Sequence, residues 1–254
     1  MYSLESVLLM EARRIIASGN STLASRQEIV QSIMAKLDDP DLSLKDIKGS
    51  FISDPGLILH IIDFANCILR NGLAQPKCTS IEAAINRLGT QGIRNALYLY
   101  QFDSMKKKLT TSWKRVFSKT IKAIPEIGNA SYLIGRSLKA SNRKAEKATT
   151  LAILNSASCF NYIAAASSLG LPVSEEIVKV ACTPSPNTNA IVLAQYNCPS
   201  TTISEIKSLA CLDSFDCVSL LSAGIAWRAH QSESSDIELA GKVYKKAELF
   251  SKCH

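Results

Sequence analysis

Apolar residues recur along this chain at the three- and four-residue spacings that place side chains on one face of a helix. Ile29, Ile33 and Leu37 lie four residues apart, and segments with the same pattern follow for most of the chain. The alternating apolar and polar positions of a half-buried strand do not occur, and no hairpin turn is flanked by β-branched runs. The pattern therefore predicts an all-α protein.

Capping residues and helix breakers divide this pattern into separate helices. Capping boxes at Ser25 and Ser235 predict two helix starts, and Pro125 with Gly128 predicts a bend or break before a helix that ends near Ser137. Further helices are expected over about 80–88, 112–124, 147–169, 174–181, 190–196, 202–209, 216–229 and 236–252.

The segment from Phe51 to Gly89 carries the most specific signals. Asp54 followed by Pro55 predicts a helix start, because aspartate accepts a hydrogen bond from an unpaired backbone N–H and proline fits the first turn. Residues 79–82 have the form of a capping box, and Gly89 is placed to stop the helix that follows.

The order of these signals resembles the HDOD family, the HD-related output domains of bacterial signalling proteins. That family's pattern is a D-P-x-L helix, an A-N dipeptide and an S-x-x-x-A-I-x-x-L-G helix. The matching residues here are Asp54, Pro55, Leu57, Ala65, Asn66, Ser80, Ala84, Ile85, Leu88 and Gly89. The resemblance implies a two-lobed helical bundle of the HDOD or HD-like type.

The resemblance also implies how the chain is organised. We expect a single HDOD-like unit over 1–254, with its core at about 23–225. An N-terminal helical lobe of about 1–104 would precede an HD-like helical lobe of about 109–230, and the C-terminal helix of about 236–252 would follow.

HDOD proteins resemble the HD-superfamily phosphohydrolases, in which histidines and aspartates hold a divalent metal that activates a water molecule. The segment Leu151–Ser158 best matches the helix that bears the His-Asp pair, and Asn155 and Ser156 stand in place of that pair. Two further ligand positions fall near Ser185 and Gly224. The resemblance therefore implies degenerate metal positions, with no catalytic residue and no metal ligand.

The histidine content agrees with this expectation. The chain has only His60, His230 and His254, so no histidine lies between residues 61 and 229, and none has a partner at metal-ligand spacing. His60 lies in an apolar helical segment and is interpreted as a structural residue. The phosphate-binding, nucleophile-elbow and zinc-protease motifs are absent as well. These absences favour a protein that is not an enzyme and has no cofactor.

Positive charge is concentrated in one segment. The net charge is +7, and residues 105–147 contain twelve basic and two acidic residues, a balance of +10. Helical spacing predicts two basic faces, which are the candidate anion-binding residues: Arg115, Lys119 and Lys122 on one, and Arg136, Lys139 and Arg143 on the other. Such faces attract a nucleotide, an acidic protein surface or nucleic acid, whereas a solvated face without a ligand is the alternative. Sparse aromatic residues argue against nucleic acid.

The termini and cysteines indicate a cytoplasmic protein. The N-terminus lacks the basic and apolar regions of a signal peptide, and the eight cysteines include no C-x-x-C pair, so we interpret them as reduced thiols. The uncharged stretch 148–174 contains several serines and asparagines and is interpreted as a helix buried in protein, not in a membrane.

Three functions follow from these patterns. The first is a non-catalytic signal-transduction module of the HDOD type, a pseudoenzyme that binds a protein partner. The second is an anion or nucleotide binder, possible ligands including a cyclic dinucleotide, that uses the basic helices of residues 105–147. The third is a residual metal-dependent phosphohydrolase, for which the chain lacks evident ligands.

Overall fold

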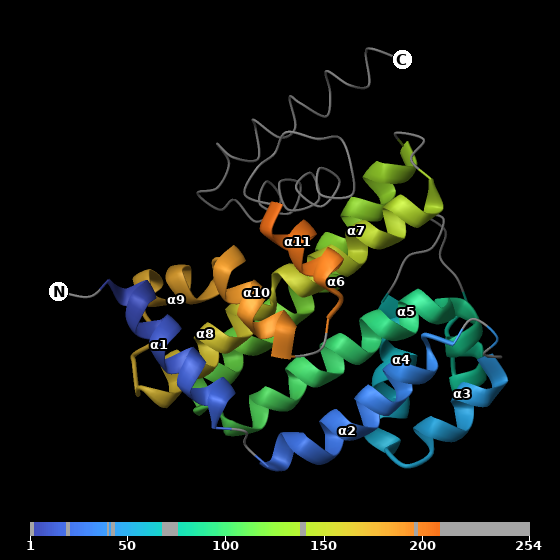
Figure 1. Cartoon of the computed structure of the whole chain (residues 1–254), viewed down its shortest axis with the longest axis horizontal. Coiled ribbons are helices and arrows are strands. Elements are labelled where there is room, and N and C mark those ends of the chain that lie inside the picture. Colours follow the sequence, from blue (N-terminus) through green and yellow to red (C-terminus); the bar gives the residue numbers. More distant parts are fainter. Residues whose placement is uncertain are drawn as a thin grey trace. The chain divides into compact units, whose positions relative to one another are not determined.

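The computed structural model describes residues 3–18, 21–39, 41, 44–67, 76–137, 141–195 and 198–208, and the regular elements in these ranges are all helices (Figure 1). In chain order they are α1 (Leu4–Ala17), α2 (Ser21–Lys36), α3 (Leu44–Phe51), α4 (Pro55–Cys67), α5 (Ile81–Ser104), the short 3-10 helix η1 (Met105–Lys108), α6 (Thr111–Ser137), α7 (Asn142–Asn155), α8 (Ala157–Ser168), α9 (Glu175–Cys182), α10 (Pro186–Gln195) and α11 (Ser200–Ser208). The all-α prediction is confirmed for this part of the chain.

The helices group into two compact units. Unit 1 takes residues 1–117 and 160–181, and unit 2 takes 118–159 and 182–254. Each unit therefore combines two stretches that are distant in sequence, and the sequence-predicted lobes of 1–104 and 109–230 stay a prediction.

Unit 1 is organised around α5, which contacts α2, α3 and α4 (Figure 1). Gly92 and the residues from Asn95 to Phe102 are buried, the latter without interruption, so this second part of α5 is covered on all sides. A second apolar cluster forms where Phe160 packs against Phe102 and Phe117, with ring centroids 5.1 and 4.8 Å apart. Full burial of one such side chain contributes about 1.5–3 kcal/mol, so these aromatic contacts stabilise unit 1 substantially.

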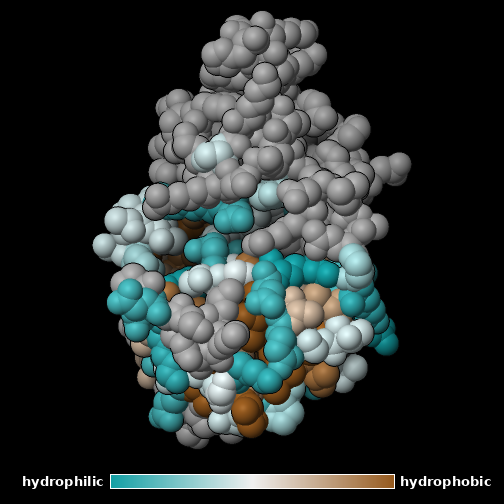
Figure 2. Space-filling model, turned by 90° about the vertical axis from the view of Figure 1, so that its right-hand side faces the viewer, coloured by the Kyte–Doolittle hydropathy of each residue, from teal (hydrophilic) through white to brown (hydrophobic). Residues whose placement is uncertain are grey.

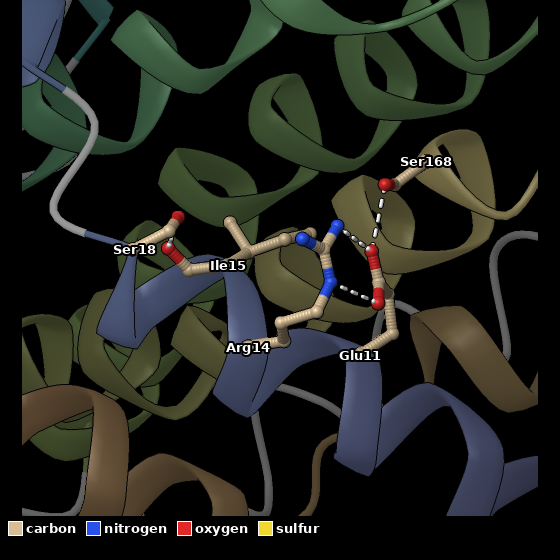
Figure 3. A network of polar contacts seen from close by, with 5 residues as sticks. All are labelled: Glu11, Arg14, Ile15, Ser18 and Ser168. Carbon is tan, nitrogen blue, oxygen red and sulfur yellow. Dashed lines mark hydrogen bonds and ion pairs between the residues drawn. The ribbon is translucent and has the colours of Figure 1, made fainter.

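Within unit 1, a polar contact joins α1 to α8 (Figure 3). The Arg14 guanidinium donates to both carboxylate oxygens of Glu11 at 2.7 Å, and the Ser168 hydroxyl of α8 donates to Glu11 Oε1 at 2.7 Å. The hydrogen bond from Arg14 lowers the pKa of Glu11 from 4.5 to about 2, because it stabilises the ionised carboxylate.

Unit 2 is built on α7, α10 and α11, which contact one another pairwise. Leu151, Leu193 and Ile206 are fully buried and come from each of these three helices in turn. Most of the uncharged stretch 148–174 lies in α7 and α8, where residues 148–167 are buried apart from the half-buried Ala164, whereas residues 168–174 are exposed or half-buried. No helix in the described ranges is long and apolar enough to span a membrane.

Two predicted helix boundaries are wrong. Helix α2 begins at Ser21 and not at the capping box of Ser25, and α6 runs through Pro125 and Gly128 without a break. Gly128 serves close helix packing instead: a Cβ atom there would lie 2.8 Å from Cγ2 of Thr149, and the Thr149 hydroxyl donates to the Gly128 carbonyl at 3.1 Å. Helix α6 therefore packs closely against α7 at Gly128, three residues after the proline that removes one backbone hydrogen bond.

The structure also shows a helix break at Ser156 and a kink at Gly89. The single helix predicted over 147–169 is divided at Ser156 into α7 and α8. Within α5, Gly89 has φ 61° and ψ −177°, so the helix that the sequence ends at Gly89 joins a second helical segment across a kink. The predicted stop at Gly89 is thereby confirmed, whereas the helices expected over 216–229 and 236–252 lie outside the described residues.

The surface is largely hydrophilic but exposes some apolar groups. Figure 2 shows brown apolar patches among teal residues on one side of the chain. On unit 1, large apolar side chains are exposed at Met10, Ile52, Leu59, Leu169 and Val173. The cysteines of the described ranges, Cys67, Cys78, Cys159, Cys182 and Cys198, form no disulfide there.

Candidate functional site

Asp54 joins the start of α4 to the C-terminal part of α5. Its Oδ1 accepts from the backbone N–H groups of Gly56 and Leu57 at 3.0 and 3.2 Å, as the predicted helix start requires. Its Oδ2 accepts from the Tyr100 hydroxyl at 2.6 Å. A Cβ atom on Gly56 would lie 3.1 Å from Asp54 Oδ1 and 3.3 Å from the Tyr100 hydroxyl, so only a small residue fits beside this pair. Both carboxylate oxygens are thus engaged in holding two helices together.

His60 lies beside the same pair and is also engaged. Its Nε2 is 2.9 Å from the carbonyl oxygen of Ala96, and its ring centroid is 5.2 Å from that of Tyr100. Burial lowers the pKa of His60, which favours the neutral imidazole with Nε2–H donating to Ala96. No group of three His, Cys, Asp or Glu residues able to hold a metal ion occurs in the described ranges. The contacts of His60 are those of a structural histidine.

The A-N dipeptide at the end of α4 holds the backbone at Cys78, twelve residues further along the chain. The Asn66 side chain donates to the Cys78 carbonyl at 3.1 Å and accepts from the Cys78 N–H at 2.8 Å. Arg87 of α5 donates to the carbonyl of Ala65 at 3.4 Å and to the carbonyl of Pro76. Asparagine is suited to this place because its amide offers one donor and one acceptor in the geometry of a peptide group.

The last part of the family pattern shapes α5. Ser80 is the N-cap, and its hydroxyl accepts from the Ala83 N–H at 3.2 Å. Ala84, Ile85 and Leu88 are buried, and Gly89 adopts the positive φ of the kink. The residues of the pattern therefore cap helices of unit 1, join them by hydrogen bonds and kink α5. Their side chains have structural roles.

Unit 2 contains a buried polar cluster at the break between α7 and α8, formed by Asn155, Ser158, Ser185 and Asn189, which we call the amide cluster. Nδ2 of Asn189 donates to the backbone carbonyl and to Oδ1 of Asn155, at 2.9 and 3.2 Å. Oδ1 of Asn189 accepts from the backbone N–H of Ser158 at 2.7 Å. The Ser158 hydroxyl accepts from the backbone N–H of Ser185 at 2.9 Å.

The amide cluster closes the ends of two helices. The first backbone N–H groups of a helix have no partner within it, so Asn189 of α10 supplies the acceptor for the first turn of α8. The same side chain donates to the last residue of α7, whose carbonyl also lacks a helical partner. One fully buried amide thus bridges the break between α7 and α8.

Two of the four predicted degenerate metal positions, Asn155 and Ser185, lie in the amide cluster. Ser156 is adjacent in sequence, but its hydroxyl donates to the Ala152 carbonyl at 3.1 Å and takes no part in the cluster. Gly224 lies outside the described residues. The structure thus brings together two segments, Leu151–Ser158 and the residues from 185 onward, that the sequence related only through the family pattern.

The nearby thiols are held in their protonated form. Sγ of Cys159 donates to the Cys182 carbonyl at 3.3 Å, and Sγ of Cys182 lies 3.6 Å from the Thr120 hydroxyl. Burial raises the pKa of both thiols. A nucleophilic cysteine requires a lowered pKa, so this pair has the character of core residues.

The structure describes the side chains of three of the six candidate anion-binding residues. Arg115, Lys119 and Lys122 are exposed on α6, and none of the three forms an ion pair with another residue in the described ranges. Lys139 and the side chains of Arg136 and Arg143 lie outside the described residues. Lys147, at the end of the same basic segment, is neutralised by an ion pair with Glu205 of α11.

Comparison with known proteins identifies the family. The HDOD domain model matches residues 23–168, more than half of the chain. The chain belongs to the HDOD family. No curated protein matches its sequence.

Three solved structures share the fold of this HDOD chain. A protein from Shewanella amazonensis, provisionally named a metal-dependent phosphohydrolase, has a TM-score of 0.66 at 13% identity, covering 94% of this chain and 90% of its own. An HDOD domain protein of unknown function from Geobacter sulfurreducens has a TM-score of 0.54 at 13% identity, covering 94% and 88%. A second Shewanella amazonensis protein, provisionally named a phosphohydrolase, has a TM-score of 0.52 at 17% identity, covering 89% of each chain. These similarities confirm the fold.

Two residues central to these sites were not singled out from the sequence. Asn189 is the last of three consecutive polar residues before the apolar run A-I-V-L, and nothing in that local pattern distinguishes it from Asn187 and Thr188. Tyr100 was expected only to lie in a helix. Its bond to Asp54 joins positions 46 residues apart, which local patterns do not reveal.

Proposed function

We propose that this chain is a non-catalytic regulatory module of the HDOD type, which acts in a bacterial signalling pathway by binding another protein. Membership of the family supports a regulatory module. The amide cluster is the observation that carries the non-catalytic part, because its residues occupy the region that the family pattern relates to the metal site of HD phosphohydrolases.

The chemistry of the amide cluster is unsuited to a catalytic metal. Divalent ions of phosphohydrolases are bound by carboxylates and imidazoles, whereas this cluster offers amides, hydroxyls and backbone groups. These groups are directed at one another: Asn189 uses its nitrogen on Asn155 and its oxygen on Ser158. Binding a metal there would leave the α8 N–H of Ser158 and the α7 carbonyl of Asn155 without partners, at a cost of about 1–3 kcal/mol each.

Metal analysis and activity assays test the non-catalytic part. We expect the purified protein to contain less than stoichiometric manganese, iron, magnesium or zinc, and to leave ATP, bis-p-nitrophenyl phosphate and cyclic dinucleotides unhydrolysed. A residual phosphohydrolase would instead hold about one metal per chain and turn over at least one of these substrates. Its activity would also fall in an Asn155→Ala variant, which separates it from a contaminating enzyme.

Binding experiments test the regulatory part. The tagged protein is incubated with native bacterial cytosol, and each captured protein is then purified and titrated against the chain by calorimetry. We expect at least one purified partner to bind with a defined stoichiometry. Failure of every captured protein to bind in purified form would contradict the proposal.

Anion binding is a second candidate function, favoured by the exposed cations of α6. Arg115 belongs to unit 1, whereas Lys119 and Lys122 belong to unit 2. Replacing all three with Gln should weaken the binding of nucleotides or cyclic dinucleotides. The plot of the logarithm of the binding constant against the logarithm of the salt concentration should also become shallower, by about one unit of slope for each phosphate group that the variant no longer neutralises. A Lys77→Gln/Lys207→Gln variant, which changes two exposed lysines elsewhere, is the control.

A further inference from the structure

Helix α4 carries apolar side chains on its inner face and on its outer face. Leu57, Ile61 and Phe64 are buried on the inner side. Asp63 is the only charged residue between positions 55 and 67. A helix that is apolar all round is normally covered by protein on every side. The outer face of α4 is exposed instead, so it lacks the cover that its composition indicates.

Pro55, Leu59 and Ile62 form a row on this outer face. They follow one another at spacings of four and three residues, which places their side chains next to one another on a helix. Pro55 is exposed, Leu59 is 64% exposed and Ile62 is half-buried. Single exposed apolar residues are ordinary on a protein surface, whereas a contiguous group of them indicates a binding surface.

Two aspartates lie close to this row. Asp63 is exposed and follows Leu59 by four residues, so the two side chains are neighbours on α4. Asp103 of α5 is half-buried and follows Tyr100 by three residues, and the Tyr100 ring packs on His60 with centroids 5.2 Å apart. Burial lowers the pKa of His60, and the charges of both aspartates act in the opposite direction. Both carboxylates therefore lie near His60, where α4 meets α5.

This part of unit 1 is negatively charged in a chain whose net charge is +7. Asp63 and Asp103 are the only charged residues within 55–67 and 95–104. The lowered pKa of His60 favours its neutral form, so the imidazole does not offset them. Among the residues that the structure describes, including the three lysines of η1, neither carboxylate has a partner in a hydrogen bond or an ion pair. Both charges are therefore available to a ligand.

We propose that Pro55, Leu59, Ile62, Asp63 and Asp103 form a docking surface for a protein segment that combines apolar side chains with lysine or arginine. We call it the α4 surface. The inference rests on the proposed protein-binding function and names its surface and the chemistry of its partner. Apolar groups at the centre of an interface supply most of its affinity, whereas charges at its rim exclude wrong partners and increase the association rate.

Charge complementarity favours a basic protein segment over other partners. Nucleic acids and anionic lipid surfaces present phosphates, which Asp63 and Asp103 repel. A second copy of this chain could offer the exposed cations of α6. Among the described residues, however, α6 has no exposed large apolar side chain that could cover Leu59. A separate segment with both kinds of side chain meets both requirements.

Selection from a random peptide library tests this inference without knowledge of the natural partner. A displayed library of twelve-residue peptides is selected against the wild-type protein, and the most enriched peptide is synthesised with a fluorescent label. We expect the enriched peptides to combine Lys or Arg with Leu, Ile or Phe. The labelled peptide should bind at least about tenfold more weakly to L59S and at least about threefold more weakly to D63N/D103N. The D63N/D103N variant should also show a weaker dependence of affinity on salt.

Matched variants control for net charge and for exposed hydrophobic area. E28Q/E176Q removes two exposed carboxylates from α2 and α9, and M10S removes an apolar side chain that is 60% exposed on α1. D63E/D103E keeps both charges of the α4 surface. Each of these three variants should change the affinity by less than about twofold. Circular dichroism of every variant verifies that it is folded.

Four results would overturn the α4 surface. The first is a selection that enriches no peptide, or only peptides that lack the basic or the apolar residues. The second is an unchanged affinity in L59S or in D63N/D103N. The third is an equal loss of affinity in the control variants. The fourth is self-association of the wild-type chain, measured by sedimentation, that L59S abolishes, because a second copy would then cover this face.

The outcomes for the α4 surface and for the proposed function are distinguishable. Purified partners that bind wild type, L59S and D63N/D103N equally would refute this surface and leave the proposed function standing. A wild-type chain that binds neither a purified partner nor a selected peptide would refute both.

Discussion

The Tyr100 hydroxyl donates a 2.6 Å hydrogen bond to Oδ2 of Asp54, and Oδ1 of the same carboxylate caps the first turn of α4. One carboxylate therefore starts a helix and fastens it to the central helix of unit 1. This double role explains the aspartate of the family's D-P dipeptide, because a carboxylate has two oxygens that can accept hydrogen bonds at the same time.

Removing the Tyr100 hydroxyl should destabilise the protein. We expect Tyr100→Phe to lower the free energy of unfolding by about 1.5–3 kcal/mol, the range for a hydrogen bond to a charged group. Urea unfolding measures the change. Asp54→Asn keeps an accepting oxygen for the helix cap but loses the acceptor for Tyr100, so a double-mutant cycle isolates the bond. A coupling energy below about 0.5 kcal/mol would show that the bond contributes little.

Truncation of Asn189 should be costly because it leaves buried groups unpaired. Asn189→Ala removes the acceptor of the Ser158 N–H and the donor to Asn155, and we expect a loss of about 2–4 kcal/mol in unfolding free energy. Asn187 is exposed on the same helix, so Asn187→Ala is the matched control and should change stability by less than about 0.5 kcal/mol. Equal effects of the two substitutions would contradict the bridging role of the amide cluster.

The kink in α5 depends on glycine. The backbone of Gly89, at φ 61° and ψ −177°, lies in a region that residues with a side chain scarcely populate. Gly89→Ala should therefore lower the unfolding free energy by at least about 1–3 kcal/mol, as measured by chemical denaturation. Gly49 lies in α3 with open space around its Cα, so Gly49→Ala should instead stabilise the protein by about 0.5–1 kcal/mol. Stabilisation by both substitutions would refute the kink.

The contact of Glu11 should make stability depend on pH. The hydrogen bond from Arg14 lowers the pKa of Glu11 to about 2 in the folded chain, so its stabilising effect is complete above pH 4.5 and is lost as the pH falls toward 2. Glu11→Gln should flatten the decline of stability across this window, as thermal unfolding at a series of pH values would reveal. Glu5, exposed on the same helix, provides the control Glu5→Gln. A wild-type profile identical to that of Glu11→Gln would disprove the contact.

The sequence predicted those parts of the fold that depend on local capping. Asp54, Ser80 and Gly89 act where the pattern placed them, because an N-cap or a glycine turn needs only a few consecutive residues. The start of α2 was missed because Ser25 sits within four residues of another serine, Ser21, and either can begin a helix.

Features that depend on distant segments escaped prediction. Pro125 and Gly128 have the local character of a helix break, yet α6 continues through both, and Gly128 packs against Thr149 of α7, a contact between positions 21 residues apart. The division of 147–169 at Ser156 likewise depends on Asn189, which lies more than thirty residues away. The positions Asn155 and Ser185 came from family resemblance, and no spacing rule alone would have related them.

Asn66 holds both backbone groups of Cys78, so the chain is secured on each side of residues 68–75. The entropy cost of holding two points of a chain together grows only with the logarithm of the number of residues between them. Residues inserted between Cys67 and Pro76 should therefore weaken these two hydrogen bonds little, which makes this stretch our choice for a fluorescent reporter or an affinity tag while partners are sought.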